Sequence, residues 1–145
     1  MAFGNPYGDP WNEDKVGQAV KKLASIGIWS ISLADTVGVA GADLIGSLVQ
    51  SVKNQYTDYD IGVHLHSRPE QAAAKVLAAY DAGCRRFDSA IGGLGGCPFA
   101  QDALVGNIPT ESVMAALQQR GVELPISKSL SDVLALNSLI ATNYS

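Results

Sequence analysis

The sequence predicts an α/β protein with a parallel sheet, on three observations. Short runs rich in β-branched residues alternate with stretches of helical periodicity along the chain, a pattern typical of parallel βα units. One strand plus one helix recurs about every 25 to 30 residues, as in repeating βα folds. Apolar residues make up 47% and charged residues 17% of the 145 residues, which favours a packed core over disorder.

The first expected element is a helix followed by a strand. Asp9 is expected to cap the helix, Pro10 suits its first turn, and Gly27 is expected to end it. The apolar residues of this helix follow helical spacing: Val16, Val20, Leu23 and Ala24. The β-branched and aromatic content of residues 28–33 then predicts the strand.

A second helix, a second strand and a third helix are expected in the middle of the chain. Residues 44–52 carry a helical apolar stripe, and residues 60–66 have the composition of a strand. Ser67 and Glu70 have the spacing of a capping box. This spacing predicts a third helix that runs to Gly83.

The last third of the chain adds one strand, a loop and two helices. Residues 85–90 are expected to form a third strand, and the glycine-rich residues 91–107 a loop. Thr110 is expected to cap a helix over residues 111–119. Amphipathic residues 129–142 predict a final helix.

Residues 1–3 resemble the end of one more strand, which raises the count to four βα units. A closed (β/α)₈ barrel has eight units and typically about 250 residues. Residues 1–145 are therefore expected to form a single partial domain, half a barrel by count, with an additional C-terminal helix. A small, complete open sheet of four strands is the alternative.

Charge and hydropathy exclude several classes of protein. The net charge is −4 and no lysine–arginine cluster occurs, so neither nucleic acid nor an anionic membrane surface is an expected partner. No apolar run approaches the roughly 20 residues that span a bilayer. The first ten residues lack the features of a signal peptide. With two cysteines and no secretory signal, reduced thiols and a cytoplasmic location are expected.

His64 and His66 are the only histidines, and both fall at the C-terminal end of an expected strand. Their spacing of two places both side chains on one face. Active sites of α/β folds form at the C-terminal ends of strands, so the pair could hold a divalent metal. The alternative is two ordinary surface or core histidines.

Three other positions could carry chemistry. Asp35 follows the first strand and is either a catalytic carboxylate or the cap of a turn, and Thr36 shares this ambiguity. The run from Gly92 to Gly96 contains four glycines, so this loop could move or lie close to a ligand. Cys97 at its tip is either a proton donor or nucleophile, or an inert thiol.

The remaining polar candidates are less distinctive. Cys84 follows a glycine that ends a helix, at the opposite end of the sheet from the histidines, and is expected to be structural. Asp88 on the third strand and Asn107 after the glycine-rich loop could both face the site.

Together these segments resemble the hydroxymethylglutaryl-CoA lyase family. Residues 33–39, LADTVGV, resemble its D-T-x-G segment, and residues 63–66, VHLH, its H-x-H metal segment. Residues 92–100, GGLGGCPFA, resemble its G-x-G-G-C-P signature loop, and Gly106 and Asn107 follow at the family's spacing. The signature loop is specific to this family, whereas the other two segments occur throughout a wider group of metal-dependent lyases and Claisen-type synthases.

The resemblance implies a TIM barrel in which this chain supplies the last four strands, its C-terminal half. It implies Mg²⁺ or Mn²⁺ held by His64, His66 and Asn107. It also implies catalytic residues: Cys97 as the thiol of a mobile loop, Asp35 as an active-site acid, and His64. The implied reaction cleaves 3-hydroxy-3-methylglutaryl-CoA, or a similar acyl-CoA, to acetyl-CoA and acetoacetate.

Two departures from the family pattern bear on activity. The family's N-terminal half supplies an arginine and a metal-binding aspartate, and neither is found in this sequence. Ser67 and Arg68 also stand where members commonly have Asp-Thr. The isolated chain is therefore expected to be inactive.

Two alternatives to the lyase remain open. They are a catalytically incomplete half barrel that associates with itself, and a fragment of a related Claisen-type synthase or aldolase. A half barrel has two open edge strands, and its inward face is expected to carry apolar residues such as Ile31, Leu33 and Val63. A homo-oligomer is therefore expected.

Overall fold

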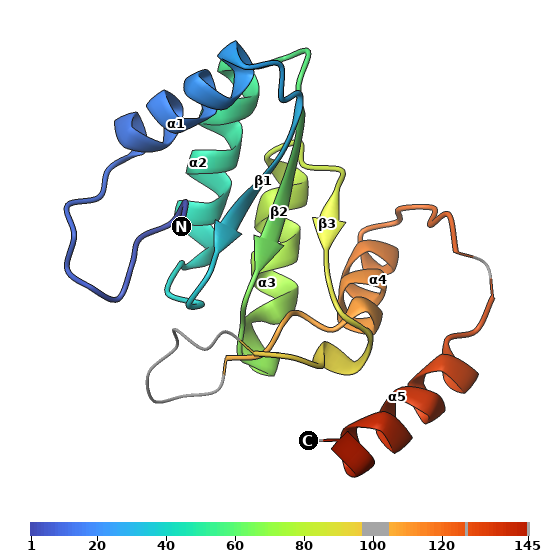
Figure 1. The fold of residues 1–145 in the computed structure, drawn as a ribbon. Coiled ribbons are helices and arrows are strands. Elements are labelled where there is room, and N and C mark those ends of the chain that lie inside the picture. The colour runs from blue at the N-terminus through green and yellow to red at the C-terminus, as the bar shows by residue number, and fades with distance from the viewer. Residues whose placement is uncertain (97–104, 127, 145) are drawn as a thin grey trace.

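A computed structural model of the chain describes residues 1–96, 105–126 and 128–144 (Figure 1). Three parallel strands form one sheet in the order β1-β2-β3. They are β1 (Ser30–Asp35), β2 (Asp60–Leu65) and β3 (Phe87–Asp88). The register pairs Leu33 with Val63, and His64 with Asp88. The expected parallel α/β class is confirmed, whereas the count of four strands is not reached among the described residues.

Helices connect and cover the strands. The helices are α1 (Glu13–Ser25), α2 (Ala42–Gln55), α3 (Pro69–Asp81), α4 (Thr110–Gln119) and α5 (Ser131–Tyr144), with a short 3₁₀ turn η1 (Ile91–Gly93). Helices α2 and α3 pack against each other on one face of the sheet, and α4 packs on α3 (Figure 1). Within the described part of the chain, no helix has the length and apolar content needed to cross a membrane.

Three expected helix caps are wrong. Helix α1 begins after Asn12, whose side chain accepts a hydrogen bond from the Lys15 N–H, so Asp9 is not its cap. Helix α3 has Arg68 at its N-cap position and no side-chain cap. The Ser67 hydroxyl donates to the Arg68 carbonyl instead of closing a capping box. Thr110 is the first residue of α4 rather than its cap.

Residues 1–3 form no strand, but they lie beside β1. The Ala2 N–H donates to the Ala34 carbonyl at 2.8 Å, and the indole N–H of Trp11 donates to the Ala2 carbonyl at the same distance. Phe3 is buried in the core. Residues 1–3 therefore contact the outer edge of β1 through one backbone hydrogen bond.

The two faces of the sheet differ in chemistry. Ile31, Leu33 and Val63 belong to the core that includes the buried residues of α2 and α3. Because side chains alternate along a strand, these residues do not line the opposite, open face of the sheet, which α2 and α3 do not cover. The expectation that they form an exposed apolar patch is wrong.

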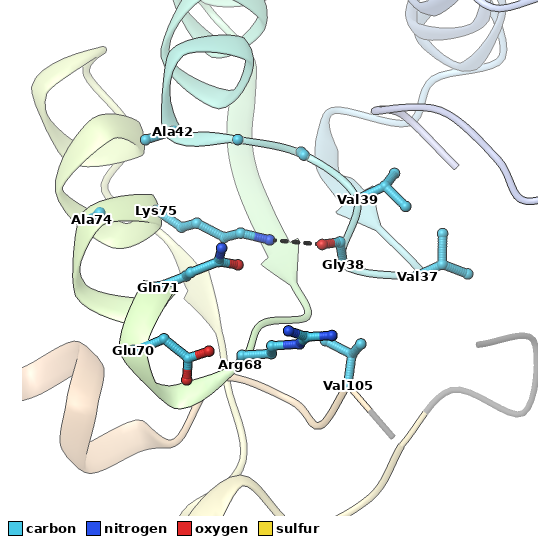
Figure 2. Close-up of a pocket in the computed structure, with 12 residues that line it drawn as sticks. Val37, Gly38, Val39, Ala42, Arg68, Glu70, Gln71, Ala74, Lys75 and Val105 are labelled. Atoms are coloured by element: carbon cyan, nitrogen blue, oxygen red, sulfur yellow. Dashed lines mark hydrogen bonds between the residues drawn. The ribbon is translucent and has the colours of Figure 1, made fainter. Parts of the chain in front are cut away.

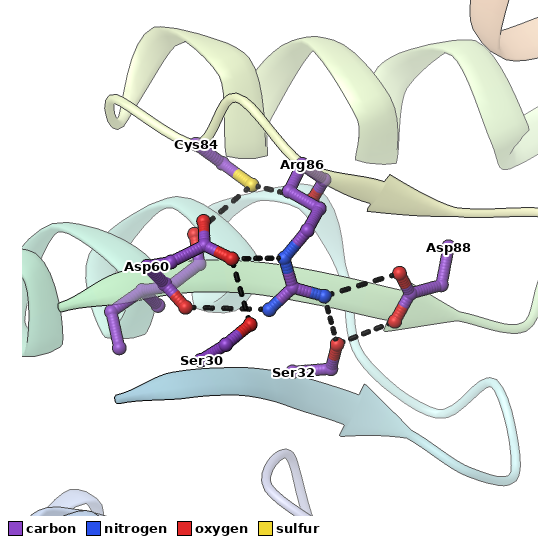
Figure 3. Close-up of polar contacts among 7 residues, drawn as sticks. Ser30, Ser32, Asp60, Cys84, Arg86 and Asp88 are labelled. Atoms are coloured by element: carbon purple, nitrogen blue, oxygen red, sulfur yellow. Dashed lines mark hydrogen bonds and ion pairs between the residues drawn. The ribbon is translucent and has the colours of Figure 1, made fainter. Parts of the chain in front are cut away.

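A network of charged and hydroxyl side chains occupies the open face instead (Figure 3). Arg86 lies across it, and its Nε and Nη1 atoms donate to Asp60 at 2.7 Å and to Asp88 at 3.2 Å. The Nη1 atom also donates to the Ser32 hydroxyl, which in turn donates to Asp88. A Cβ atom at position 62 would lie 2.6 Å from the Arg86 Cζ, so glycine there makes room for the guanidinium group.

Candidate functional site

The two histidines converge at the C-terminal end of β2, as their spacing predicts. Their Nε2 atoms lie 3.2 Å apart, and the rings are 5.1 Å apart between centroids at an angle of 70°. His64 is half-buried on the open face, and His66 is buried just beyond the strand. The pairing of His64 with Asp88 places that carboxylate on the same face of the sheet.

The proton on His66 is fixed by its surroundings. Its Nδ1 atom lies 3.1 Å from the carbonyl oxygen of Val105. A carbonyl only accepts hydrogen bonds, so Nδ1 carries the proton and Nε2 presents a lone pair. A carbonyl on the far nitrogen is the usual support of a metal-binding imidazole. Nε2 of His66 is therefore prepared to accept a bond from a ligand or from His64.

Asn107 lies next to His66 through an antiparallel backbone bridge. Its side-chain amide donates to the Leu94 carbonyl at 3.1 Å and to the Gly95 carbonyl at 3.5 Å. The amide nitrogen is thereby committed, and no described hydrogen bond involves Oδ1. This oxygen is available to a cation.

The base of the glycine-rich loop is packed tightly against this asparagine. Gly92, Gly93 and Gly95 have φ angles of +63°, +67° and +91°. A Cβ atom at position 93 would lie 2.9 Å from the Asn107 carbonyl oxygen, and one at position 95 would lie 3.2 Å from its side-chain nitrogen. The glycines therefore permit a left-handed backbone and a close approach to Asn107.

Cys97 lies outside the described residues, so the expectation that it stands over the site stays a prediction. Cys84 is fully buried, and its thiol contacts the Arg86 carbonyl oxygen at 3.1 Å. Burial raises the pKa of the Cys84 thiol above its usual value. Such a thiol is unreactive, consistent with its expected structural role.

Asp35 is the most enclosed carboxylate that the structure describes, with only 1% of its surface exposed. Its oxygens accept hydrogen bonds from the backbone N–H groups of Val39 and Ala40 and from the Lys75 ammonium group. The residue therefore caps the turn after β1, one of the two roles expected for it. A catalytic role stays a prediction.

Lys75 was missed by sequence reasoning and lies at the centre of these contacts. It is 2% exposed and forms an ion pair with Asp35 at 3.0 Å. The signal was present in the sequence, because Lys75 interrupts an apolar stripe of α3 that includes Ala72, Val76 and Ala79. A lysine in such a stripe is buried only when paired.

A cavity of about 580 Å³ opens beside Lys75, between the loop after β1 and the first turns of α3 (Figure 2). Gly38, Arg68 and Val105 contribute to its lining. Figure 2 shows the Lys75 side chain reaching past this cavity to the Gly38 carbonyl. The loop after β1 is thereby joined to the helix that follows the histidines.

The separation of the two histidine Nε2 atoms is compatible with a shared octahedral divalent cation. Two ligand atoms at right angles around an octahedral cation, each about 2.1 Å away, lie about 3 Å apart. The two Nε2 atoms have this separation. Among the described residues, no three His, Cys, Asp or Glu side chains gather at one point. Further ligands would have to be the Asn107 amide oxygen, substrate, water or groups outside the described part.

Known proteins are similar to this chain along most of its length. Residues 1–140 match the HMGL-like family model. The chain is 34% identical over 140 residues to the (R)-citramalyl-CoA lyase of Chloroflexus aurantiacus, covering 97% of this chain and 43% of that protein. It is 38% identical over 121 residues to the cytoplasmic 3-hydroxy-3-methylglutaryl-CoA lyase of Rattus norvegicus, covering 83% of this chain and 35% of that protein.

Solved lyase structures share the fold of this chain. An HMG-CoA lyase from Acenitobacter baumannii, in complex with coenzyme A and 3-methylmalate, superposes with a TM-score of 0.81 at 36% identity. The alignment covers 97% of this chain and 45% of that one. The carboxyl transferase domain of Rhizobium etli pyruvate carboxylase shares the fold at a TM-score of 0.61 and 23% identity. The chain thus spans less than half the length of the lyases that it matches.

Proposed function

Since the chain belongs to the HMGL-like family, we propose that it carries the metal-binding part of a carbon–carbon lyase acting on an acyl-CoA. One observation carries the proposal: the Nε2 atoms of His64 and His66 converge at a strand end, and the backbone of Asn107 is bridged to that of His66. In a βα fold, this end of the sheet is where catalytic groups gather.

The proposed reaction is cleavage of 3-hydroxy-3-methylglutaryl-CoA to acetyl-CoA and acetoacetate. Citramalyl-CoA, which would yield acetyl-CoA and pyruvate, is the second candidate substrate. It is favoured by the match to an (R)-citramalyl-CoA lyase, which spans 97% of the chain. Both substrates carry a hydroxyl group on the carbon whose bond breaks, so one site chemistry serves either.

Each residue of the site has a proposed task. His64, His66 and Asn107 would hold Mg²⁺ or Mn²⁺ through Nε2, Nε2 and Oδ1. The bound cation would supply charge stabilisation for the oxygens of the substrate. The Val105 carbonyl keeps the His66 lone pair directed at the site. Cys97 would donate a proton to the carbon that leaves as acetyl-CoA.

The complete barrel would need strands that this chain does not contribute. In the family they bring an arginine and an acidic metal ligand, so the isolated chain is proposed to bind metal without cleaving substrate. An inactive half barrel, or part of a Claisen-type synthase or aldolase, remains the alternative. The Cys97 loop favours the lyase over those enzymes.

Complementation tests this proposal. The chain would be refolded with the N-terminal half of the Acenitobacter baumannii lyase, and acetoacetate and pyruvate would be measured from the two thioesters in Mn²⁺. Acetoacetate or pyruvate is expected from the mixture and not from the chain alone. The Cys97→Ala variant is expected to form the same complex with at least about 100-fold lower activity. A stable complex that cleaves neither thioester would contradict the lyase assignment.

A further inference from the structure

We infer that Lys75 is a positioning residue that sets the orientation of His66. The inference rests on the proposed metal site, because it assigns a support to one of the proposed ligands. It starts from an unusual group: a lysine that is only 2% exposed, on a helix whose other buried residues are apolar.

The ammonium group is fully engaged, and all three of its partners lie at the candidate site. Lys75 Nζ donates to Oδ2 of Asp35 at 3.0 Å, to the His66 carbonyl at 3.0 Å and to the Gly38 carbonyl at 3.1 Å. An ammonium group has three protons, so each partner uses one. A single side chain thus joins α3 to the ends of two strands.

The bond to His66 matters because the ladder of the sheet has ended there. β2 stops at Leu65, so the carbonyl of His66 has no partner in a named strand. Its N–H donates to the Asp35 carbonyl at 3.3 Å, and its C=O accepts from Lys75. The backbone of the metal-binding residue is therefore held on both sides by the Asp35–Lys75 pair.

The same pair also fixes the imidazole from the far side. Gly38, with φ +70°, lies so close to Val105 that a Cβ atom there would be 2.6 Å from the Val105 Cγ1. Val105 supplies the carbonyl that binds Nδ1 of His66. By holding Gly38, Lys75 keeps the loop after β1 against the residue that determines the His66 tautomer.

The alternative is that the pair only stabilises the fold. Removing Lys75 alone would leave a buried carboxylate unpaired, which threatens folding whatever its role. Two double variants avoid this problem. Asp35→Asn/Lys75→Met removes both charges and the donor, whereas Asp35→Asn/Lys75→Gln removes both charges but keeps a donor directed at the His66 carbonyl. The matched control, Asp81→Asn/Arg120→Met, removes the exposed ion pair between α3 and α4.

The experiment compares the imidazole ¹⁵N resonances of His66 in the metal-free proteins, then titrates each protein with Mn²⁺. The unchanged chain and the control are expected to show the Nδ1-protonated tautomer. The methionine variant is expected to show a mixture of tautomers and Mn²⁺ binding weaker by about 10-fold or more, with partial rescue in the glutamine variant.

Identical His66 resonances in all four proteins would overturn the inference. Failure of the unchanged chain to bind Mn²⁺ would instead overturn the proposed function, while the resonances still decide the role of Lys75.

Discussion

The Nε2 atoms of His64 and His66 lie 3.2 Å apart, at the point where β2 ends and the signature loop returns to the sheet. A cation could replace the hydrogen bond between these two nitrogens, since imidazole nitrogens are common metal ligands. Changing both residues to alanine is expected to reduce Mn²⁺ affinity at least about 100-fold, measured by isothermal titration calorimetry. An Asp81→Ala variant, altered on the exposed surface of α3, serves as the control. Undiminished binding by the double variant would show that Mn²⁺ sits elsewhere.

The close packing of Gly93 against Asn107 yields a paired prediction. Gly93 and Gly121 have φ angles of +67° and +80°, but only Gly93 has a neighbouring atom within 4 Å of the added Cβ. Gly121→Ala is expected to cost about 1 kcal/mol of unfolding free energy, from backbone strain alone. Gly93→Ala is expected to cost about 2 to 4 kcal/mol, because strain and overpacking add.

Urea unfolding and Mn²⁺ titration of both glycine variants check this prediction. Gly93→Ala is also expected to weaken Mn²⁺ binding, because the alanine methyl group would displace the Asn107 backbone. Gly121→Ala is expected to leave Mn²⁺ binding unchanged. Equal losses of stability and equal affinities in the two variants would show that the loop relaxes freely and does not position Asn107.

Asp60 makes the fold sensitive to acid. The Ser30 hydroxyl, followed by the Arg86 guanidinium, holds the pKa of the Asp60 carboxyl below its ordinary value of 3.8, although partial burial opposes them. A carboxyl whose pKa is lower in the folded state stabilises the fold above its unfolded pKa. This contribution is lost as the pH falls from about 3.8 through the lower folded value.

The urea midpoint is therefore expected to drop more steeply below about pH 4 in the unchanged chain than in Ser30→Ala. The Ser30→Ala variant loses the hydrogen bond at 2.7 Å that lowers this pKa most. Ser47→Ala, which removes a hydroxyl whose described hydrogen bond lies within α2, should follow the unchanged chain. Superimposable profiles for the unchanged chain and Ser30→Ala would show that the Ser30 hydroxyl does not lower the pKa of Asp60.

The two thiols are expected to differ in reactivity. Cys84 is fully buried and its pKa is raised by that burial, so iodoacetamide should label Cys97 first under native conditions. Peptide mapping by mass spectrometry measures the two rates, and unfolding in urea should make them equal. Faster native labelling of Cys84 would contradict the proposed exposure of Cys97.

Self-association is expected from the strand edges rather than from an apolar face. Along the outer edge of β1, the described backbone hydrogen bonds include a single one to residues 1–3. Unpaired edge groups favour pairing with a second chain. Light scattering at micromolar concentration is expected to give a dimer or larger species. A folded monomer near 15.2 kDa would contradict this expectation.

The sequence predicted what depends on periodicity. A spacing of two placed His64 and His66 on one face whatever the packing around them. Helix starts were predicted poorly, because nearby polar residues compete for each N-terminus. The side chain of Asn12, rather than that of Asp9, accepts the hydrogen bond from the Lys15 N–H at the start of α1. Such competition depends on the path of the chain and has no signature in spacing.

Three-dimensional proximity explains what was missed. Nothing in the sequence connects Lys75 with Asp35, 40 positions earlier. The glycines of the signature loop were predicted to let the loop move or lie close to a ligand, whereas Gly93 and Gly95 closely approach Asn107 of the same chain. Periodicity also could not decide which face of β1 lies under the helices, so Ile31 and Leu33 were assigned to the wrong side.

The order of the strands in the sheet is the order in which they are synthesised. Each strand pairs with the one made immediately before it, across one intervening helix. Each pairing closes a loop that contains a helix, as between Ser30 and Asp60, and parallel pairing is slow because this loop must close before the contacts form. During synthesis, β1, α2 and β2 are therefore made before β3, and both histidines exist in the growing chain before Asn107, the third proposed ligand.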